Sequence, residues 1–285
     1  MTAATASFRS RAQQLRSFTV PKREAIYPTL KDKVILVSGG AGGIGKETAR
    51  LLAASGAKIS LADFSEKPLN DFAAELRDTF SGVQVLTSVV DVRKQESVES
   101  WISQACSDFG GARIDGVANL AGVLPKNSLA SSASIENVTN EVWEQCIGVN
   151  LTGLMYCMRA QIPRMNDHAS MVNAASVAGV KGYGNSAAYG ASKFGVVGLT
   201  RCAAQDVGKD RGIRVNAVAP GTVRTPMLTD LGMCLGELKD NPVMPGSLNR
   251  DGMPEEIAAL IVWLLSSESS FVTGAIYSID GGHTT

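Results

Sequence analysis

Residues 34–46 are Val-Ile-Leu-Val-Ser-Gly-Gly-Ala-Gly-Gly-Ile-Gly-Lys, an apolar run that passes directly into a cluster of glycines. The run predicts a buried strand over residues 34–38, and a helical pattern begins at Lys46. Glycines have no Cβ atom, so backbone amides and a helix N-terminus can approach a pyrophosphate closely. The stretch therefore predicts a dinucleotide site on Gly39, Gly43, Ile44 and Gly45.

An acidic residue stands where such a site would bind the adenosine ribose. Asp63 ends the next apolar run, 18 residues after Gly45. Its carboxylate can accept hydrogen bonds from ribose hydroxyls and would repel a 2′-phosphate, and no Arg or Lys lies next to it to bind that phosphate. We therefore expect NAD rather than NADP as the cofactor. The alternative is a solvated acid at the end of a strand.

Short apolar runs alternate with longer helical patterns along the rest of the chain. The runs do not alternate strictly between apolar and polar residues, which indicates strands covered on both faces, as in a parallel sheet. This order predicts a single α/β domain with a doubly wound, Rossmann-type, seven-stranded parallel sheet and a ligand at the carboxyl ends of its strands. The expected strands are residues 34–38, 58–63, 83–91, 116–121, 170–174, 214–218 and 275–279, and the expected helices are residues 46–54, 97–109, 141–165, 189–206 and 254–265.

The composition excludes several classes of function. With 27 basic and 27 acidic residues the net charge is zero, so no overall field would hold nucleic acid. The five cysteines are scattered and the two histidines stand alone, which favours neither a disulfide framework, nor a metal site, nor a Ser-His-Asp triad. Most of the cysteines should be small buried hydrophobes. No apolar run is long enough to span a membrane, and we predict a cytoplasmic protein.

Two segments fall outside the regular pattern. Residues 1–30 precede the expected 31–285 domain as an N-terminal extension, and up to Glu24 they contain basic, Ser and Thr residues but no acid. Mitochondrial presequences and surface arms share this composition, so a mitochondrial location stays open as the alternative. Residues from about 225 to 253 mix Leu, Met, Gly and Pro without a period, and we expect them to form a mobile substrate lid.

Four polar residues indicate the chemistry. Tyr189 and Lys193 are four residues apart, which on a helix is one face. Ser176 lies 13 residues before Tyr189, just past an expected strand, and Asn150 lies in the preceding helix. A base that oxidises an alcohol must accept a proton near neutral pH, but a free phenol has a pKa of about 10. A lysine charge about 4 Å away would contribute about 4 kcal/mol at an effective dielectric of about 20, which would lower the pKa of Tyr189 toward the working range.

In order and spacing these residues resemble the classical short-chain dehydrogenase/reductase family over residues 31–282. The family's glycine motif, Thr-Gly-x-x-x-Gly-x-Gly, is present with Ser38 in place of threonine. Its Asn-Asn-Ala-Gly motif is present at residues 119–122 with Leu120 in place of the second asparagine. We expect little chemical consequence from either change. The Asn-Ser-Tyr-Lys tetrad matches Asn150, Ser176, Tyr189 and Lys193, and the Pro-Gly motif matches Pro220 and Gly221.

The resemblance implies a role for each matched residue. Tyr189 would transfer the proton, Lys193 would also bind the nicotinamide ribose, and Ser176 would hold the substrate oxygen, while Asn150 would anchor a water relay to Lys193. Asp91 and Val92 would flank the adenine, Asn119 and Gly122 would line the cofactor site, and Val223 and Thr225 would meet the nicotinamide carboxamide. The family commonly pairs the equivalents of the helices at Glu141 and Tyr189, so we expect a homo-oligomer, a tetramer or a dimer. The low charged content, 19%, favours the same expectation.

Together these residues predict an NAD-dependent oxidoreductase that interconverts a secondary alcohol and a ketone. Apolar residues of the expected lid, with Tyr183 as an aromatic wall, favour a bulky apolar ring of secondary metabolism, such as a terpenoid, steroid-like or polyketide-derived ring. The lid residues are Met227, Leu228, Leu231, Met233, Leu235, Leu238 and Met244. They could instead pack a helix pair or a subunit contact. An NADPH-dependent carbonyl reductase and a catalytically idle NAD-binding regulatory protein remain alternatives.

Overall fold

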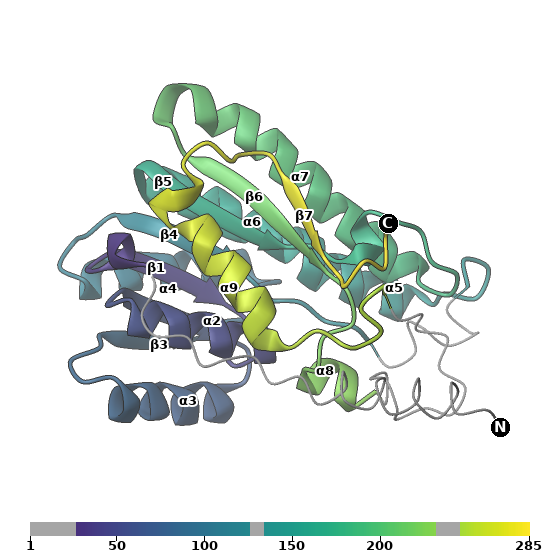
Figure 1. The fold of residues 1–285 in the computed structure, drawn as a ribbon, viewed down its shortest axis with the longest axis horizontal. Coiled ribbons are helices and arrows are strands. Elements are labelled where there is room, and N and C mark those ends of the chain that lie inside the picture. Colours follow the sequence, from purple (N-terminus) through teal and green to yellow (C-terminus); the bar gives the residue numbers. More distant parts are fainter. Residues whose placement is uncertain (1–26, 126–133, 232–245) are drawn as a thin grey trace, which may run out of the picture.

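The computed structural model describes residues 27–125, 134–231 and 246–285. They form three layers, with one parallel sheet between two layers of helices (Figure 1). In this part of the chain, seven strands run in the order β3-β2-β1-β4-β5-β6-β7, and every neighbouring pair is parallel. The predicted doubly wound, Rossmann-type sheet in a single domain is confirmed. The strands are β1 (Val34–Ser38), β2 (Lys58–Asp63), β3 (Val85–Val89), β4 (Ile114–Asn119), β5 (Met165–Ala174), β6 (Arg214–Pro220) and β7 (Ile276–Ile279).

Helices cover both faces of the sheet, and each face has its own apolar core. The helices α4 (Gln95–Asp108), α6 (Gly153–Gln161) and α7 (Ala187–Arg211) pack on one face. The helices α2 (Gly43–Ala54), α3 (Glu66–Thr79) and α9 (Pro254–Leu265) pack on the other. Every residue of β1 and β6 is buried, because helices lie above and below them. This double covering explains why the strands are apolar without alternation.

The long helix predicted over residues 141–165 is wrong, because the chain breaks there into several elements. They are α5 (Asn140–Cys146), the π-helical turn η3 (Ile147–Thr152), α6 and the 3₁₀ turn η4 (Ile162–Arg164). Gly153 lies where a Cβ atom would come within 2.8 Å of Val92, so the break brings this helix close to the loop after β3. Pro163 cannot continue a helix, and β5 begins at Met165, five residues earlier than expected.

Helix α3 is absent from the sequence prediction. Most of its residues are polar, and the buried side chains Leu69, Phe72, Ala73 and Leu76 form a single narrow stripe. This spacing of three and four residues is that of an amphipathic helix. The signal was therefore present in the sequence, but it was weaker than in the apolar helices.

The ends of the chain and the expected lid are described only in part. Residues 1–26 of the expected extension lie outside the described residues, but Tyr27 and Leu30 are buried against the domain. Of the expected lid, the short helix α8 (Pro226–Thr229) is described and residues 232–245 are not. After this gap Leu248 donates a backbone hydrogen bond to Gly281, near the C-terminus. In the described ranges, no helix combines the length and the apolar composition that crossing a bilayer requires.

Candidate active site

The glycine loop between β1 and α2 lies tightly against the loop after β4. Gly39 has a φ of +72°, and a Cβ atom on it would lie 2.8 Å from the backbone of Leu120 and Ala121. A Cβ atom on Gly45 would lie 2.1 Å from the carbonyl oxygen of Gly39. Only glycine fits both positions. The turn therefore brings the N-terminus of α2 to the carboxyl edge of the sheet, as a pyrophosphate site requires.

Asp63 ends β2 beside this loop. One carboxylate oxygen accepts a hydrogen bond from the backbone N–H of Ala41 at 3.0 Å, and the other accepts one from Ser65 N–H at 3.0 Å. These bonds fix the carboxylate next to the glycine turn, at the edge where the sequence places the adenosine ribose. The donors and the acid therefore fit a dinucleotide whose ribose hydroxyls are free.

The residues expected around the adenine lie at the same edge. Arg93 donates two hydrogen bonds to Asp91, of 2.9 and 2.8 Å, and holds the pKa of that carboxyl below its usual range. Val92 is buried. The side chain of Asn119 points into the protein, where it bonds Gln161 and Asn173 at 2.9 to 3.1 Å. Asn119 thus braces β4 against its neighbours.

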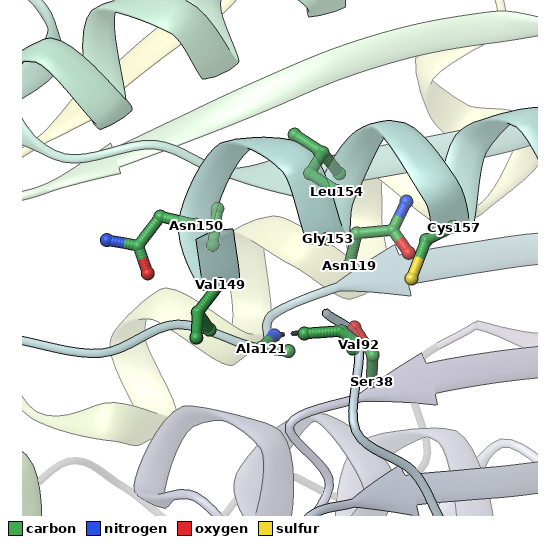
Figure 2. Close-up of a pocket in the computed structure, with 10 residues that line it drawn as sticks. Ser38, Val92, Asn119, Ala121, Val149, Asn150, Gly153, Leu154 and Cys157 are labelled. Carbon is green, nitrogen blue, oxygen red and sulfur yellow. Dashed lines mark hydrogen bonds between the residues drawn. The ribbon is translucent and has the colours of Figure 1, made fainter. Parts of the chain in front are cut away.

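A small cavity lies behind the carboxyl edge of β1 and β4 (Figure 2). It has a volume of about 10 Å³, which is room for about one water molecule. Figure 2 shows the helical stretch that carries Val149, Asn150 and Cys157 along one side of it. On the other side the hydroxyl of Ser38 accepts a hydrogen bond from the backbone of Ala121 at 3.3 Å, so this replacement for the family's threonine still ties β1 to the loop after β4.

Asn150 lies in the π-helical turn, where its side chain makes three hydrogen bonds. Its Oδ1 accepts from the backbone N–H of Val123 at 2.8 Å, and its Nδ2 donates to Val123 O at 3.0 Å and to Ser192 Oγ at 3.1 Å. Ser192 in turn donates to the carbonyl of Tyr189 at 2.7 Å. Asn150 therefore ties the loop after β4 to α7. Ser192 was not predicted, although it lies inside the Tyr189–Lys193 motif.

Tyr189, Lys193 and Ser176 meet at the start of α7. The side chain of Ser176 lies close enough to the phenol of Tyr189 to favour its charged form, and Lys193 Nζ lies 5.7 Å from the centre of the Tyr189 ring. Lys193 is buried and donates a hydrogen bond to the carbonyl of Ala174 at 2.8 Å. Burial lowers its pKa to about 8, because a charged ammonium loses its hydration there. The structure thus brings the expected catalytic residues together.

The pKa of Tyr189 differs from the sequence expectation. Lys193 was expected to lower it, but burial raises it, and the nearby side chain of Ser176 offsets this only in part. The physical reason is the loss of hydration of the buried phenolate, and Lys193 is not among the groups that lower this pKa. The buried thiol of Cys146 interacts electrostatically with both residues, and burial raises its own pKa to about 11.

The expected burial of the cysteines holds for only some of them. Cys146 and Cys157 are buried, Cys106 is half-buried and Cys202 is exposed. Cys234 lies outside the described residues. In the described part of the chain no group of His, Cys, Asp and Glu residues has the arrangement of a metal site.

An open cleft of about 500 Å³ lies next to two of the predicted catalytic residues, Asn150 and Lys193. It is formed by the loop after β4, by α5 and by α8 with the two residues that follow it. At one end is Gly122, where a Cβ atom would lie 3.4 Å from Lys193 Nζ and 3.3 Å from Asn150 Oδ1. The lining residues are Gly122, Val123, Leu124, Pro125, Val142, Gln145, Met227, Asp230 and Leu231. The cleft has the size and the mostly apolar lining of a small-molecule site.

The residues expected near the nicotinamide and the substrate lie in two separate parts of the structure. Val223 and Thr225 are buried just before α8, and Thr225 packs against Gly43, where a Cβ atom would lie 2.9 Å from its methyl group. Tyr183 stacks on His283 with ring centres 5.5 Å apart, and its hydroxyl is buried without a hydrogen-bond partner among the described residues. The expected aromatic wall is thus paired with the C-terminal residues.

Comparison with known proteins gives consistent matches over the domain. A family model described as enoyl-(acyl carrier protein) reductase matches residues 39–284. The short-chain dehydrogenase/reductase aba4 of Botryotinia fuckeliana (strain B05.10) is 46% identical over 88% of this chain and 96% of its own length. The 2,5-dichloro-2,5-cyclohexadiene-1,4-diol dehydrogenase of Sphingobium indicum is 41% identical over 90% and 98%. The crystal structure of levodione reductase superposes with a TM-score of 0.78 at 35% identity, covering 88% of this chain and 97% of that one.

Proposed function

Because the chain belongs to the short-chain dehydrogenase/reductase family, we propose that it interconverts a secondary alcohol and a ketone on a bulky, largely apolar ring, with NAD as the cofactor. The observation that carries this proposal is the meeting of Ser176, Tyr189 and Lys193 beside a mostly apolar cleft of about 500 Å³. The chain is an oxidoreductase by family; the substrate, the cofactor form and the hydride transfer belong to the proposal.

The catalytic residues divide the work as follows. A bound nicotinamide supplies the acceptor or donor of a hydride. Ser176 holds the substrate oxygen, and Tyr189 exchanges a proton with it. Since burial raises the pKa of Tyr189, the resting phenol is neutral and ready to protonate a ketone oxygen, and alcohol oxidation needs the proton to leave first. Lys193 lies next to the phenol with a pKa of about 8, so it can lose or accept a proton near neutral pH.

The preference for NAD rests on Asp63, and we expect Asp63→Ala to raise the KM for NAD and to narrow the gap to NADP. The substitution removes the acceptor for ribose hydroxyls and the negative charge that repels a 2′-phosphate. Steady-state kinetics with both nucleotides check this, with Asp78→Ala on the exposed side of α3 as the control. A wild-type protein that already prefers NADP would refute the ribose argument.

The substrate class can be tested with a panel of alcohols at matched concentrations. We expect hydrophobic ring alcohols to give a higher kcat/KM with NAD than sugar alcohols or linear hydroxy acids, because six of the nine cleft residues are apolar side chains. The name of one relative, the cyclohexadiene-diol dehydrogenase, also refers to a six-membered ring. If a sugar alcohol or a linear hydroxy acid gives the highest value, the proposed substrate class is wrong.

Assembly and location belong to the same proposal. Trp143 on α5 and Phe194 on α7 are 41% and 47% exposed, which favours a homotetramer or dimer that covers these helices. A role in secondary metabolism follows from the proposed ring substrate. We place the protein in the cytoplasm, with mitochondrial import, on the composition of residues 1–24, as the alternative.

A further inference from the structure

Two polar side chains line the otherwise apolar cleft. Gln145 extends from α5 and Asp230 lies directly after α8. The side chains that share the cleft with them are Val123, Leu124, Pro125, Val142, Met227 and Leu231. Neither Gln145 nor Asp230 forms a side-chain hydrogen bond or an ion pair with another described residue. Both are therefore available to a ligand in the cleft.

A ligand that fills the cleft displaces water from the side chains of both Gln145 and Asp230. A ring that covers them without hydrogen-bonding them removes their water and leaves them unpaired, which weakens binding. A ring with a matching polar group replaces the water and gains affinity. Sites with such groups reject analogues that lack the matching oxygen more strongly than apolar pockets reject an added one.

Gln145 lines the same cleft as Gly122, which lies beside Lys193. Its neighbour in the sequence, Cys146, is close enough to interact electrostatically with Tyr189 and Lys193. The same cleft reaches Gly122, where a Cβ atom would lie 3.4 Å from Lys193 Nζ. A ring with one carbon at Tyr189 can therefore occupy the cleft that Gln145 lines.

We propose that the substrate ring carries, besides the reacting alcohol or ketone, a second uncharged oxygen that Gln145 binds, and that Asp230 disfavours ring carboxylates. This rests on the proposed function. The carboxamide of Gln145 can donate to a carbonyl or accept from a hydroxyl, so it suits diols, hydroxyketones and diketones. The carboxylate of Asp230 can accept from a hydroxyl but repels another carboxylate.

Three ring alcohols of one size test the proposal with NAD. They are trans-cyclohexane-1,4-diol, trans-4-methylcyclohexanol and trans-4-hydroxycyclohexanecarboxylate. We expect the wild-type kcat/KM to be highest for the diol, after correction for its two equivalent hydroxyls, and lowest for the carboxylate. In Gln145→Leu the ratio of diol to methylcyclohexanol should fall about threefold to tenfold, as for the loss of one hydrogen bond. The control is Glu144→Leu, an exposed neighbour on α5 outside the cleft, which should leave the ratio unchanged.

A second variant tests the charge. In Asp230→Asn the ratio of the carboxylate to methylcyclohexanol should rise about fivefold at low salt, and the rise should shrink as salt is added, because screening weakens repulsion in the wild type. Asp210→Asn, an exposed acid at the end of α7, is the control. A salt-independent rise, or no rise, would overturn the role of Asp230.

The outcomes separate this inference from the proposed function. If methylcyclohexanol is turned over at least as well as the diol, or if Gln145→Leu leaves their ratio unchanged, the inference about the second oxygen is wrong while the ring-alcohol activity stands. The wild-type protein should oxidise the probes faster than the Tyr189→Phe variant does. If it oxidises none of them faster, even at the highest soluble concentration, both the inference and the proposed activity fail for this class of ring.

Discussion

Tyr189→Phe should lose at least about a hundredfold in turnover while nucleotide binding is retained. The substitution removes one hydroxyl, the group beside Ser176 to which we assign the proton exchange, and keeps the buried ring. Acid–base groups of this kind typically contribute about 10²-fold to 10⁴-fold to the rate. The substrate oxygen would then lose the proton partner that we assign to it, because the phenylalanine ring has no proton to give or accept.

The measurement pairs steady-state turnover with a binding titration of NAD. Tyr156→Phe is the matched control, because Tyr156 lies on α6 with its ring against Arg159 and takes no part in the site. A Tyr189→Phe protein that keeps more than about a tenth of wild-type turnover would remove Tyr189 from its assigned role. Loss of NAD binding in the same variant would instead indicate a structural defect.

Lys193→Met should change how the stability of the protein depends on pH. The pKa of Lys193 is lowered from 10.5 to about 8 by burial. Between these two values the unfolded chain binds a proton that the folded protein does not, so raising the pH through this window stabilises the wild type relative to the variant. Below pH 8 the buried charge has its full cost. The difference in unfolding free energy should therefore shift by about 3 kcal/mol between pH 7 and pH 10.5, at about 1.36 kcal/mol per pKa unit.

Urea unfolding of both proteins across this range, without nucleotide, gives the difference directly. Groups that titrate in both proteins and do not interact with Lys193 cancel in the comparison, and a Cys146→Ala background for both proteins removes the thiol that does interact with it. Lys209→Met, at the exposed end of the same helix, is expected to show no such shift. A difference in unfolding free energy that stays constant from pH 7 to 10.5 would mean that folding does not lower the pKa of Lys193. Its assignment as a proton partner of Tyr189 would then lose its support.

The sequence was informative where a single local pattern determines the structure. The bounds of β1, β2 and α9 agree with the prediction to the residue, because each is a mostly apolar segment with clear ends. Helix α3 was missed because its apolar stripe is narrow and most of its residues are polar. The first residues of β5, Met-Asn-Asp-His, are mostly polar and did not indicate a strand.

In the candidate site, too, only the features that a local sequence pattern determines could be predicted. The tetrad could be predicted because its members are recognisable by type and spacing. The bonds of Asn150 to Val123 and Ser192 could not, since these residues are 27 and 42 positions away and meet only through the π-helical turn. The pKa of Tyr189 was also mispredicted, because burial is a property of the folded protein and not of a spacing.

The hydrogen-bonded amides around Asn119 favour one register of β4 against β5. Asn119 of β4 pairs directly with Asn173 of β5, and Gln161 and Thr200 hold them from the helix layer. If either strand docks one residue out of step, these buried amides point to the wrong side of the sheet and lose their partners. Each unpaired group costs about 1 to 3 kcal/mol. The buried amides therefore destabilise a shifted register of β4 and β5, which apolar packing alone would distinguish less strongly. Correct strand alignment is thus favoured by hydrogen bonding as well as by packing.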